Sequence, residues 1–485
     1  MKYSVALAAG AVAAVLLGIA VLPRPIHDTQ LVREVRDVFL AAPRLPPLVP
    51  RQWDPSELST ATTPQRFFTR DPERARLPLH WTRTHLADRG GGGVLPTMQQ
   101  GASEFVLARG QETDYERSRT VRRVNATFRQ FWGPSTNSSV LSYHTGPLSA
   151  WPSDLRAEVG QIDRDFSVHD APADIRRDRW PASSANVWAG HAGVLATTHF
   201  DTSHNFVVQV FGTKRWLLWP PSELPALRLH PSSHPSRRQT RMQLLRRGVN
   251  GSRLADGYSR CPAHHEVMGP GDVLYVPPFW AHAVFTEEVG LSLSILSPSW
   301  LEAAWARASW YELPFNQLQD SATDRMLAAG VFISTLLPKC QALKGTTPRA
   351  FLHRDVHWAR HAPISANEDV ACSTHYASAE LAQCREVLGG DRQRDFIHLI
   401  EETSSKVAAV LDREEGSHSF DAAVGRELLA GYVDQLANWA VGEEQMGAFL
   451  CCISESLPRS LSINQCPSMC HGTIQALFSW YVLCD

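Results

Sequence analysis

Three residues have the types and the spacing of metal ligands. His199 and Asp201 stand two positions apart at the end of the apolar run 193–198, and His282 follows another apolar run much later in the chain. Residues i and i+2 of a β-strand point to the same face, so the imidazole of His199 and the carboxylate of Asp201 converge on one side. If a barrel brings His282 there too, two imidazoles and one carboxylate bind one face of a metal and leave its other positions open. This arrangement selects non-haem Fe(II) in oxygenases.

A lysine adds a second part to this predicted site. Lys214 lies 13 residues after Asp201, where a fixed cation can pair with the distal carboxylate of a dicarboxylate cosubstrate. We therefore predict 2-oxoglutarate as that cosubstrate. A second His-x-Asp triplet, His353-Arg354-Asp355, lies outside the part of the chain that carries these residues. We interpret the second triplet as a coincidence.

The elements that must position these residues form a β-rich block. Between about 103 and 300, short apolar runs are bounded by turn residues, as is typical of a β-rich domain. Two such runs flank Gly212-Thr213, which predicts a hairpin, and 268–278 is a second hairpin-like stretch. Residues 291–295 alternate strictly between apolar and polar, which predicts a strand with one apolar face.

The last third of the chain has a different pattern. Helical periodicity occurs in four ranges after residue 300, namely 301–313, 323–337, 394–411 and 422–436. The chain therefore has β-rich structure first and helical structure afterwards, which is a mainly β fold with α.

Three spaced motifs, 198–205, 209–221 and 269–282, resemble those of the cupin-type JmjC hydroxylases, a group that includes the asparaginyl hydroxylase of hypoxia-inducible factor. The resemblance covers about residues 100–300. It implies a double-stranded β-helix, the cupin or jelly-roll core, which holds Fe(II) and 2-oxoglutarate and consumes O2.

Carried over position by position, the resemblance implies that His199, Asp201 and His282 are the iron ligands and that Lys214 binds the C5 carboxylate of 2-oxoglutarate. It also implies that Asn205 and Thr197 line the cosubstrate pocket. The sequence departs from the asparaginyl hydroxylase at position 196, where Ala replaces a hydroxyl-bearing residue. Thr197 or a tyrosine such as Tyr143 would then supply the missing hydrogen bond.

The N-terminus and the cysteines indicate a compartment. Between Lys2 and Arg24 lie 21 uncharged residues, enough to span a bilayer, and we predict a signal anchor with a cleaved signal peptide as the alternative. We thus expect a single-pass type II membrane protein in the secretory lumen (ER or Golgi), or a secreted protein if cleavage occurs. Three Asn-x-Ser/Thr triplets, and nine cysteines of which none precedes Cys261, agree with glycosylation and with a disulfide-linked tail.

These features divide the chain into four parts. Residues 1–23 are the signal anchor or signal peptide, 24–100 a Pro-rich stalk leading into the next domain, 101–300 the JmjC/cupin-like catalytic domain, and 301–485 a helical Cys-rich region.

The balance of charge excludes some classes of function. With 47 Lys and Arg against 49 Asp and Glu, and 44% hydrophobic residues, the chain is neither disordered nor a generally basic nucleic-acid binder. We predict an Fe(II)- and 2-oxoglutarate-dependent dioxygenase that hydroxylates a side chain of a protein or peptide. The alternatives are a JmjC-type lysine demethylase and a non-catalytic, metal-binding cupin that serves as an interaction module. A homodimer through the C-terminal region is left open.

Overall fold

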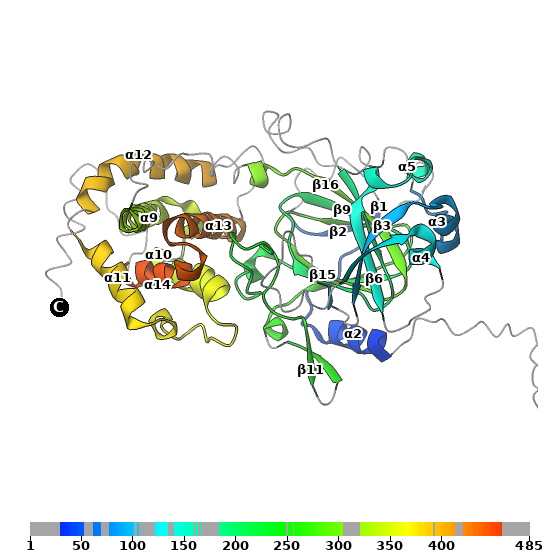
Figure 1. The fold of residues 1–485 in the computed structure, drawn as a ribbon, viewed down its shortest axis with the longest axis horizontal. Coiled ribbons are helices and arrows are strands. Elements are labelled where there is room, and N and C mark those ends of the chain that lie inside the picture. Colours follow the sequence, from blue (N-terminus) through cyan, green and yellow to red (C-terminus); the bar gives the residue numbers. More distant parts are fainter. Residues whose placement is uncertain are drawn as a thin grey trace, which may run out of the picture. The chain divides into compact units, whose positions relative to one another are not determined.

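The computed structural model of the protein comprises two compact units (Figure 1). The first includes the chain up to Pro220 together with Met242–Ser299, and the second includes Pro221–Arg241 and the chain from Trp300 onward. The structure describes residues 30–52, 62–68, 77–100, 104–105, 122–133, 140–159, 162, 166, 184–248, 251–255, 257–303, 321–390, 393–412 and 421–457.

The first unit contains two large β-sheets. Across the nine-stranded sheet of the described residues, the order is β1 (Arg51–Gln52), β2 (Gln65–Phe68), β14 (Asp272–Val276), β9 (His204–Phe211), β16 (Gly290–Ser297), β7 (Ser184–Gly190), β6 (Leu141–Pro147), β3 (Val94–Gln100) and β5 (Arg122–Thr127). Across the five-stranded sheet the order is β13 (His264–Met268), β10 (Lys214–Trp219), β15 (Ala281–Thr286), β8 (Leu195–His199) and β4 (Glu104–Phe105). A separate ribbon consists of β11 (Leu245–Gly248) and β12 (Gly251–Leu254).

Strands that follow one another in the sequence belong alternately to the two sheets. From β7 to β10 the chain changes sheet at every turn, and it does so again from β13 to β16. This is the winding of a double-stranded β-helix, so the predicted fold class is confirmed. The two predicted hairpins are wrong: β9 does not pair with β10, nor β13 with β14, because each turn crosses from one sheet to the other. A glycine turn that closes a hairpin also suits such a corner, so the sequence signal is the same for both.

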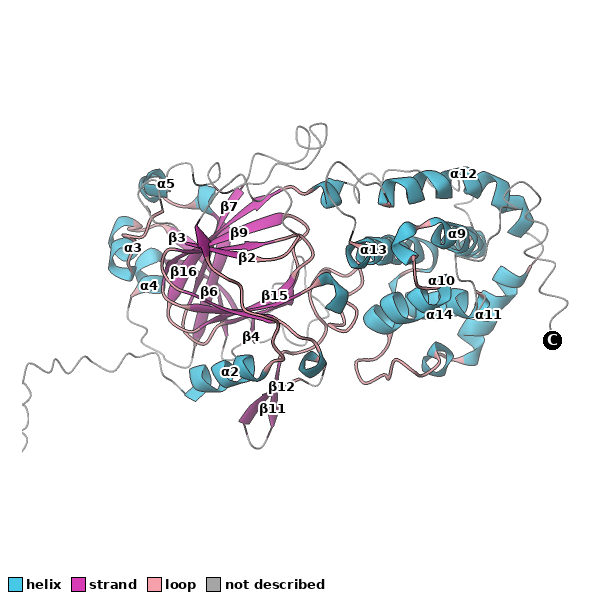
Figure 2. Ribbon diagram, turned by 180° about the vertical axis from the view of Figure 1, so that it is seen from behind, coloured by secondary structure: helices cyan, strands magenta, loops and turns pink. Residues whose placement is uncertain are grey.

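The larger sheet has two different faces. Apolar side chains on one face of β9 and β16, among them Phe206, Leu291 and Leu293, belong to a core with helices α3 (Arg83–Arg89), α4 (Phe128–Trp132) and α5 (Ser153–Val159). Both ribbon views show these helices grouped on one side of the strands (Figure 2). On the opposite face, Val207 packs with Trp216 of the smaller sheet. The alternation predicted for 291–295 thus separates a helix-covered face from the interior between the sheets.

Residues that precede the predicted catalytic domain also contribute structure. The range 24–100, for which we predict a stalk, contains helix α2 (Gln30–Ala41) as well as α3 and strands β1, β2 and β3. The β2 strand pairs with β14, so this range adds strands to the larger sheet.

The second unit is helical. Its helices are α9 (Ala322–Leu336), α10 (Pro348–Ala350), the π-helix η9 (Phe351–His361), the 3-10 helix η10 (Cys372–His375), α11 (Ser378–Gly389), α12 (Gln393–Leu411), α13 (Ala422–Val441) and α14 (Met446–Ser456). The predicted helices 323–337, 394–411 and 422–436 correspond to α9, α12 and α13, whereas most of 301–313 lies outside the described residues. Two disulfides, Cys372–Cys451 and Cys384–Cys452, tie α14 to η10 and to α11.

A segment between the sheet strands belongs to the helical unit. The guanidinium of Arg228 donates to the carbonyl oxygens of Ala362 and Pro363 at 2.9 and 2.8 Å and lies over the Trp358 ring. The amide of Ser232 donates to the fully buried Asp434 at 3.0 Å. The range 221–241 is thus fixed to the rest of the second unit by buried polar contacts.

The predicted membrane anchor requires correction. Residues 3–23 lie outside the described part of the chain, and none of the described helices is both long enough and apolar enough to cross a bilayer. The prediction of a type II membrane protein in the secretory lumen is contradicted by this finding, and we do not retain it.

Gly212 forms the corner that carries the chain from β9 to β10. Its φ is 72°, and a Cβ at this position would collide with the carbonyl oxygen of Val289. We expect Gly212→Ala to lower the free energy of unfolding by about 2 kcal/mol or more, because the alanine is strained in φ and also forces a backbone shift. Gly92→Ala is the matched control, since Gly92 is exposed in a turn and its Cβ would meet open space. Urea denaturation followed by tryptophan fluorescence measures both, and equal stabilities would contradict this role of Gly212.

Candidate metal centre

Two neighbouring strands bring the two histidines together. Strand β15 pairs antiparallel with β8, and in this register His282 is the direct partner of His199. Their ring centroids are 4.3 Å apart. One ligand atom each from His199, Asp201 and His282 lies within 4.8 Å of the other two. The structure therefore collects the three residues that the sequence analysis selected into one group that could hold a metal ion.

Backbone hydrogen bonds orient both imidazoles. Nδ1 of His199 lies 2.8 Å from the carbonyl oxygen of Thr197, and Nδ1 of His282 lies 3.1 Å from that of Trp280. A carbonyl oxygen only accepts, so in each ring Nδ1 is the donor and Nε2 carries the lone pair. A hydrogen bond from the other ring nitrogen is the usual way in which proteins fix a metal-ligating histidine. Burial and the neighbouring His199 lower the pKa of His282 to about 4, so this ring is neutral near pH 7.

A polar chain from β9 and β16 holds the carboxylate of Asp201. Its Oδ2 accepts from the amide nitrogen of Asn205 at 3.1 Å, and Asn205 Oδ1 accepts from the hydroxyl of Ser294 at 2.6 Å. The same Oδ2 lies 3.9 Å from Nε2 of His282. Asn205, a residue of β9, thus contacts a candidate metal ligand directly and is also bonded to Ser294 of β16.

The turn before His282 is tied to the Asp201 loop. Phe279 has a φ of 66°, a region that bulky residues rarely adopt. Its amide donates to the carbonyl oxygen of Asp201 at 2.8 Å, and its ring stacks on Phe200 with centroids 5.1 Å apart. This bond and the stacking maintain the unusual backbone conformation, and they fix the distance between the two segments that carry the ligands.

Lys214 is buried in the same interior. It is 2% exposed, and its Nζ donates to the carbonyl oxygen of Trp188 at 2.9 Å and to the hydroxyl of Ser292 at 2.7 Å. Among the residues that the structure describes, no carboxylate forms an ion pair with it. Burial therefore lowers the pKa of Lys214 to about 7. A buried ammonium with only neutral partners is an unfavourable group unless an anion binds beside it.

The strand register sets the distance between Lys214 and His282 along the sheet. Lys214 is opposite Thr286 of β15, four residues beyond His282. At about 3.3 Å per residue, this separation is about 13 Å along the strand. A lysine side chain and a short dicarboxylate can together bridge that length.

Thr197 and Tyr143, which the sequence analysis considered for the pocket, and two tryptophans of the first unit have different environments. Thr197 is 2% exposed on β8, and Tyr143 is buried, with its pKa raised by burial. Trp280 belongs to the apolar core between the sheets and donates to the carbonyl oxygen of Thr62 at 3.0 Å, so it is a core residue. Trp188 contributes its carbonyl to Lys214.

Sequence reasoning missed Ser292 and Trp216. Ser292 contacts Lys214, and the ring of Trp216 lies 5.5 Å from that of His282. The signal for Ser292 was present, because Ser292 and Ser294 alternate with leucines and so form the polar face of β16. The position of Trp216, two residues after Lys214 on the same face of β10, gave a comparable signal.

A second group of possible ligands in the first unit is internally satisfied. His80, His85 and Glu158 have ligand atoms within 4.8 Å of one another. The Glu158 carboxylate, however, also accepts from the indole of Trp81 at 2.6 Å and from Arg89 at 3.3 Å. Burial would raise the pKa of Glu158, but its donors outweigh burial and hold it at about 2. We interpret this group as a structural network around one carboxylate.

Comparisons with known proteins agree with this geometry. A family model described as "Cupin-like domain" matches residues 68–317. The fruit fly (Drosophila melanogaster) "Jumonji C domain-containing protein 5" is 29% identical over 29% of this chain and 34% of its own length. The Arabidopsis thaliana "Lysine-specific demethylase JMJ31" is 28% identical over 23% of this chain and 20% of its own. Cattle (Bos taurus) "HSPB1-associated protein 1" is 30% identical over 46% of this chain and 45% of its own.

The chain spans less than half the length of each of these curated relatives. The family match covers just over half of this chain, including all three candidate ligands and Lys214. The chain therefore belongs to the cupin-like, JmjC-type family.

Proposed function

We propose that this chain is an Fe(II)- and 2-oxoglutarate-dependent oxygenase that hydroxylates a side chain of a protein or peptide. The observation that carries the proposal is the combination of two parts. One is a group of two imidazoles and one carboxylate, in which both histidines keep Nε2 for a metal. The other is a buried lysine in the same interior that lacks a carboxylate partner among the described residues.

The donor set fits ferrous iron. Two neutral imidazoles and one carboxylate on one side of a metal leave the remaining positions for other ligands, which is the arrangement found in non-haem Fe(II) oxygenases. His199, Asp201 and His282 would hold the iron, and Asn205 would orient Asp201. Lys214 and Ser292 would bind the distal carboxylate of 2-oxoglutarate, with Thr197 as a further contact.

The bound groups supply the oxidising chemistry: O2 converts 2-oxoglutarate to succinate and CO2, and one oxygen atom enters a C–H bond of the substrate. The protein's residues would bind and orient these groups. The carbonyl of Thr197 and that of Trp280 keep the protons of His199 and His282 on Nδ1, and the carboxyl of Asp201 is kept in place by Asn205. Trp216 packs beside His282 and covers it from water.

A second candidate reaction has one specific observation in its favour. One relative is named a lysine-specific demethylase, and hydroxylation of an N-methyl group would release formaldehyde. Products therefore separate the two activities on a peptide substrate: a stable gain of one oxygen atom supports side-chain hydroxylation, and formaldehyde supports demethylation. A chain that consumes no 2-oxoglutarate under either condition would instead be a binding module.

Loss of a single candidate ligand should abolish the metal site. Anaerobic addition of Fe(II) and 2-oxoglutarate should give the weak visible charge-transfer band of the chelate. We expect His199→Ala and Asp201→Ala to remove both the band and succinate formation. His264→Ala serves as the matched control, because His264 lies on β13 of the same unit and packs on Trp280 rather than on the three ligands. Retention of the band in Asp201→Ala would contradict the assignment.

Lys214 should account for much of the cosubstrate's binding energy. A charge-assisted contact is worth about 1.5–3 kcal/mol, so Lys214→Met should weaken 2-oxoglutarate binding by roughly 10- to 150-fold in anaerobic calorimetry. Arg215→Met is the control, since Arg215 is the next residue on the strand but pairs with Glu287 at 2.6 Å. Equal losses in the two variants would show that general charge, and not the position of Lys214, controls binding.

Binding of 2-oxoglutarate should also depend on pH. Because burial lowers the pKa of Lys214 to about 7, the free site loses its positive charge as the pH rises through 7. A bound carboxylate favours the charged form, so above pH 7 binding takes up a proton and the Kd rises by up to about tenfold per pH unit. Calorimetry in two buffers of different ionisation enthalpy measures this proton uptake. A Kd that stays constant from about pH 6.5 to 8.5 would contradict the role of Lys214.

A further inference from the structure

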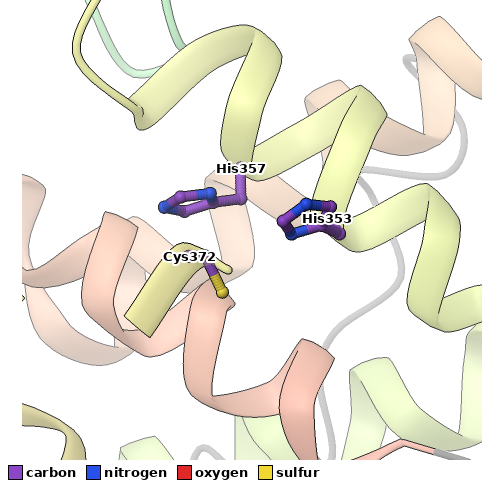
Figure 3. A group of neighbouring side chains, drawn as sticks. All are labelled: His353, His357 and Cys372. Carbon is purple, nitrogen blue, oxygen red and sulfur yellow. The ribbon is translucent and has the colours of Figure 1, made fainter. Parts of the chain in front are cut away.

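A second cluster of metal-ligating side chains lies in the helical unit. One ligand atom each from His353, His357 and Cys372 lies within 4.8 Å of the other two. Figure 3 shows the two imidazoles from the η9 helix beside the Cys372 side chain from η10. The rings are stacked with centroids 6.3 Å apart. Because η9 is a π-helix, residues four apart face nearly the same side.

Each of the two rings keeps a nitrogen that its neighbours do not use. Nε2 of His353 lies 3.0 Å from the carbonyl oxygen of Glu368, and Nε2 of His357 lies 2.8 Å from the hydroxyl of Tyr376. His357 is 1% exposed, and its buried Nδ1 has no hydrogen-bond partner. Burial, reinforced by His361 and His353, lowers the pKa of His357 to about 3, so the ring is neutral. A buried nitrogen without a partner is unfavourable, and its presence needs an explanation.

Cys451 is the candidate for a fourth ligand. Cys372 is joined to Cys451 of α14 by a disulfide. Cys372 and Cys451 also form a second ligand group with Glu455, again within 4.8 Å. Glu455 is already engaged by Arg385, whose guanidinium donates to Oε2 at 2.8 Å. The Cys372–Cys451 bond joins Cys451 to a member of the His353–His357–Cys372 group. Its reduction would therefore leave one thiol within that group and a second thiol next to it, and two histidines with two cysteines are the composition of structural zinc sites.

We propose that Cys372 and Cys451, once reduced, bind one Zn²⁺ together with His353 and His357. The same residues then have two alternative states, a disulfide or a zinc site, and the redox conditions select between them. In the zinc state the metal links η9, η10 and α14, the elements that the disulfide otherwise connects only in part. This inference does not depend on the proposed oxygenase activity.

The conversion balances as a thiol–disulfide exchange. A dithiol reductant gives two electrons and two protons to the Cys372–Cys451 bond and is itself oxidised to a disulfide. The S–S bond breaks and two thiols form. When Zn²⁺ binds, each thiol releases its proton to solvent, and the two thiolates and two neutral imidazoles give a complex with no net charge. A neutral complex suits a site in which both cysteines are at most 2% exposed.

Cobalt is a direct probe of this site. We expect the full chain, reduced by a phosphine and freed of metal without oxygen, to bind Co²⁺ with a thiolate-to-cobalt charge-transfer band and the visible bands of tetrahedral cobalt. Zn²⁺ should displace the cobalt and remove these bands. The oxidised chain should show no thiolate band, and the group formed by His199, Asp201 and His282 contributes none because it contains no sulfur.

Variants separate this site from the second disulfide. His353→Ala, at a partly exposed position, should weaken Zn²⁺ binding more than roughly 100-fold, beyond the usual effect of residues outside the ligand set. The matched control is the double variant Cys384→Ser/Cys452→Ser, which removes the other disulfide of α14 and should keep the band. The proposal is overturned if the reduced chain gives no thiolate band, or if the band survives His353→Ala or disappears in the control.

Reduction also tests the site through stability. If the reduced helical unit loses helicity in circular dichroism, Zn²⁺ should restore it, because metal binding contributes directly to folding. If the reduced unit stays folded, Zn²⁺ should raise its Tm. A reduced chain whose helicity and Tm do not respond to Zn²⁺ would overturn the proposal.

Discussion

The candidate site depends on the antiparallel pairing of β8 with β15. This pairing places His282 opposite His199, and a shift of one residue in register would turn either imidazole away from the interior. A contact outside the sheet supports this register. Phe279, in a backbone conformation that few bulky residues adopt, is bonded to Asp201 and stacked on Phe200. The third candidate ligand is thus connected to the other two through the backbone as well as through the sheet.

The two faces of the larger sheet differ in polarity. The apolar face packs on α3, α4 and α5 and contributes stability through burial. The other face carries Ser292, Ser294 and Asn205, which would be unfavourable in an apolar core unless they were hydrogen-bonded. Each of them is hydrogen-bonded: Ser294 donates to Asn205, Asn205 donates to Asp201, and Ser292 accepts from Lys214. These three polar residues therefore lie on the interior surface, where a charged ligand would have to be recognised.

The sequence allowed prediction of local relations but not of the long-range pairing. The spacing of His199 and Asp201 predicted a shared face, and periodicity predicted α9, α12 and α13. Turn residues predicted hairpins, but the same residues form the corners between the sheets, and only the global winding decides between the two. The attachment of 221–241 to the helical unit depends on contacts such as Arg228 with Ala362, which no local pattern signals. The approach of Cys372 to His353 and His357 likewise has no local signal in the sequence, because η9 and η10 meet only in the folded chain.

The most direct test of the account is a crystal structure of the chain with Mn²⁺, a non-reacting substitute for Fe²⁺, and 2-oxoglutarate. We predict one metal ion bound by Nε2 of His199, Nε2 of His282 and a carboxylate oxygen of Asp201, with the distal carboxylate of 2-oxoglutarate at Lys214. A metal ion bound by other residues, or 2-oxoglutarate that does not reach Lys214, would contradict the account.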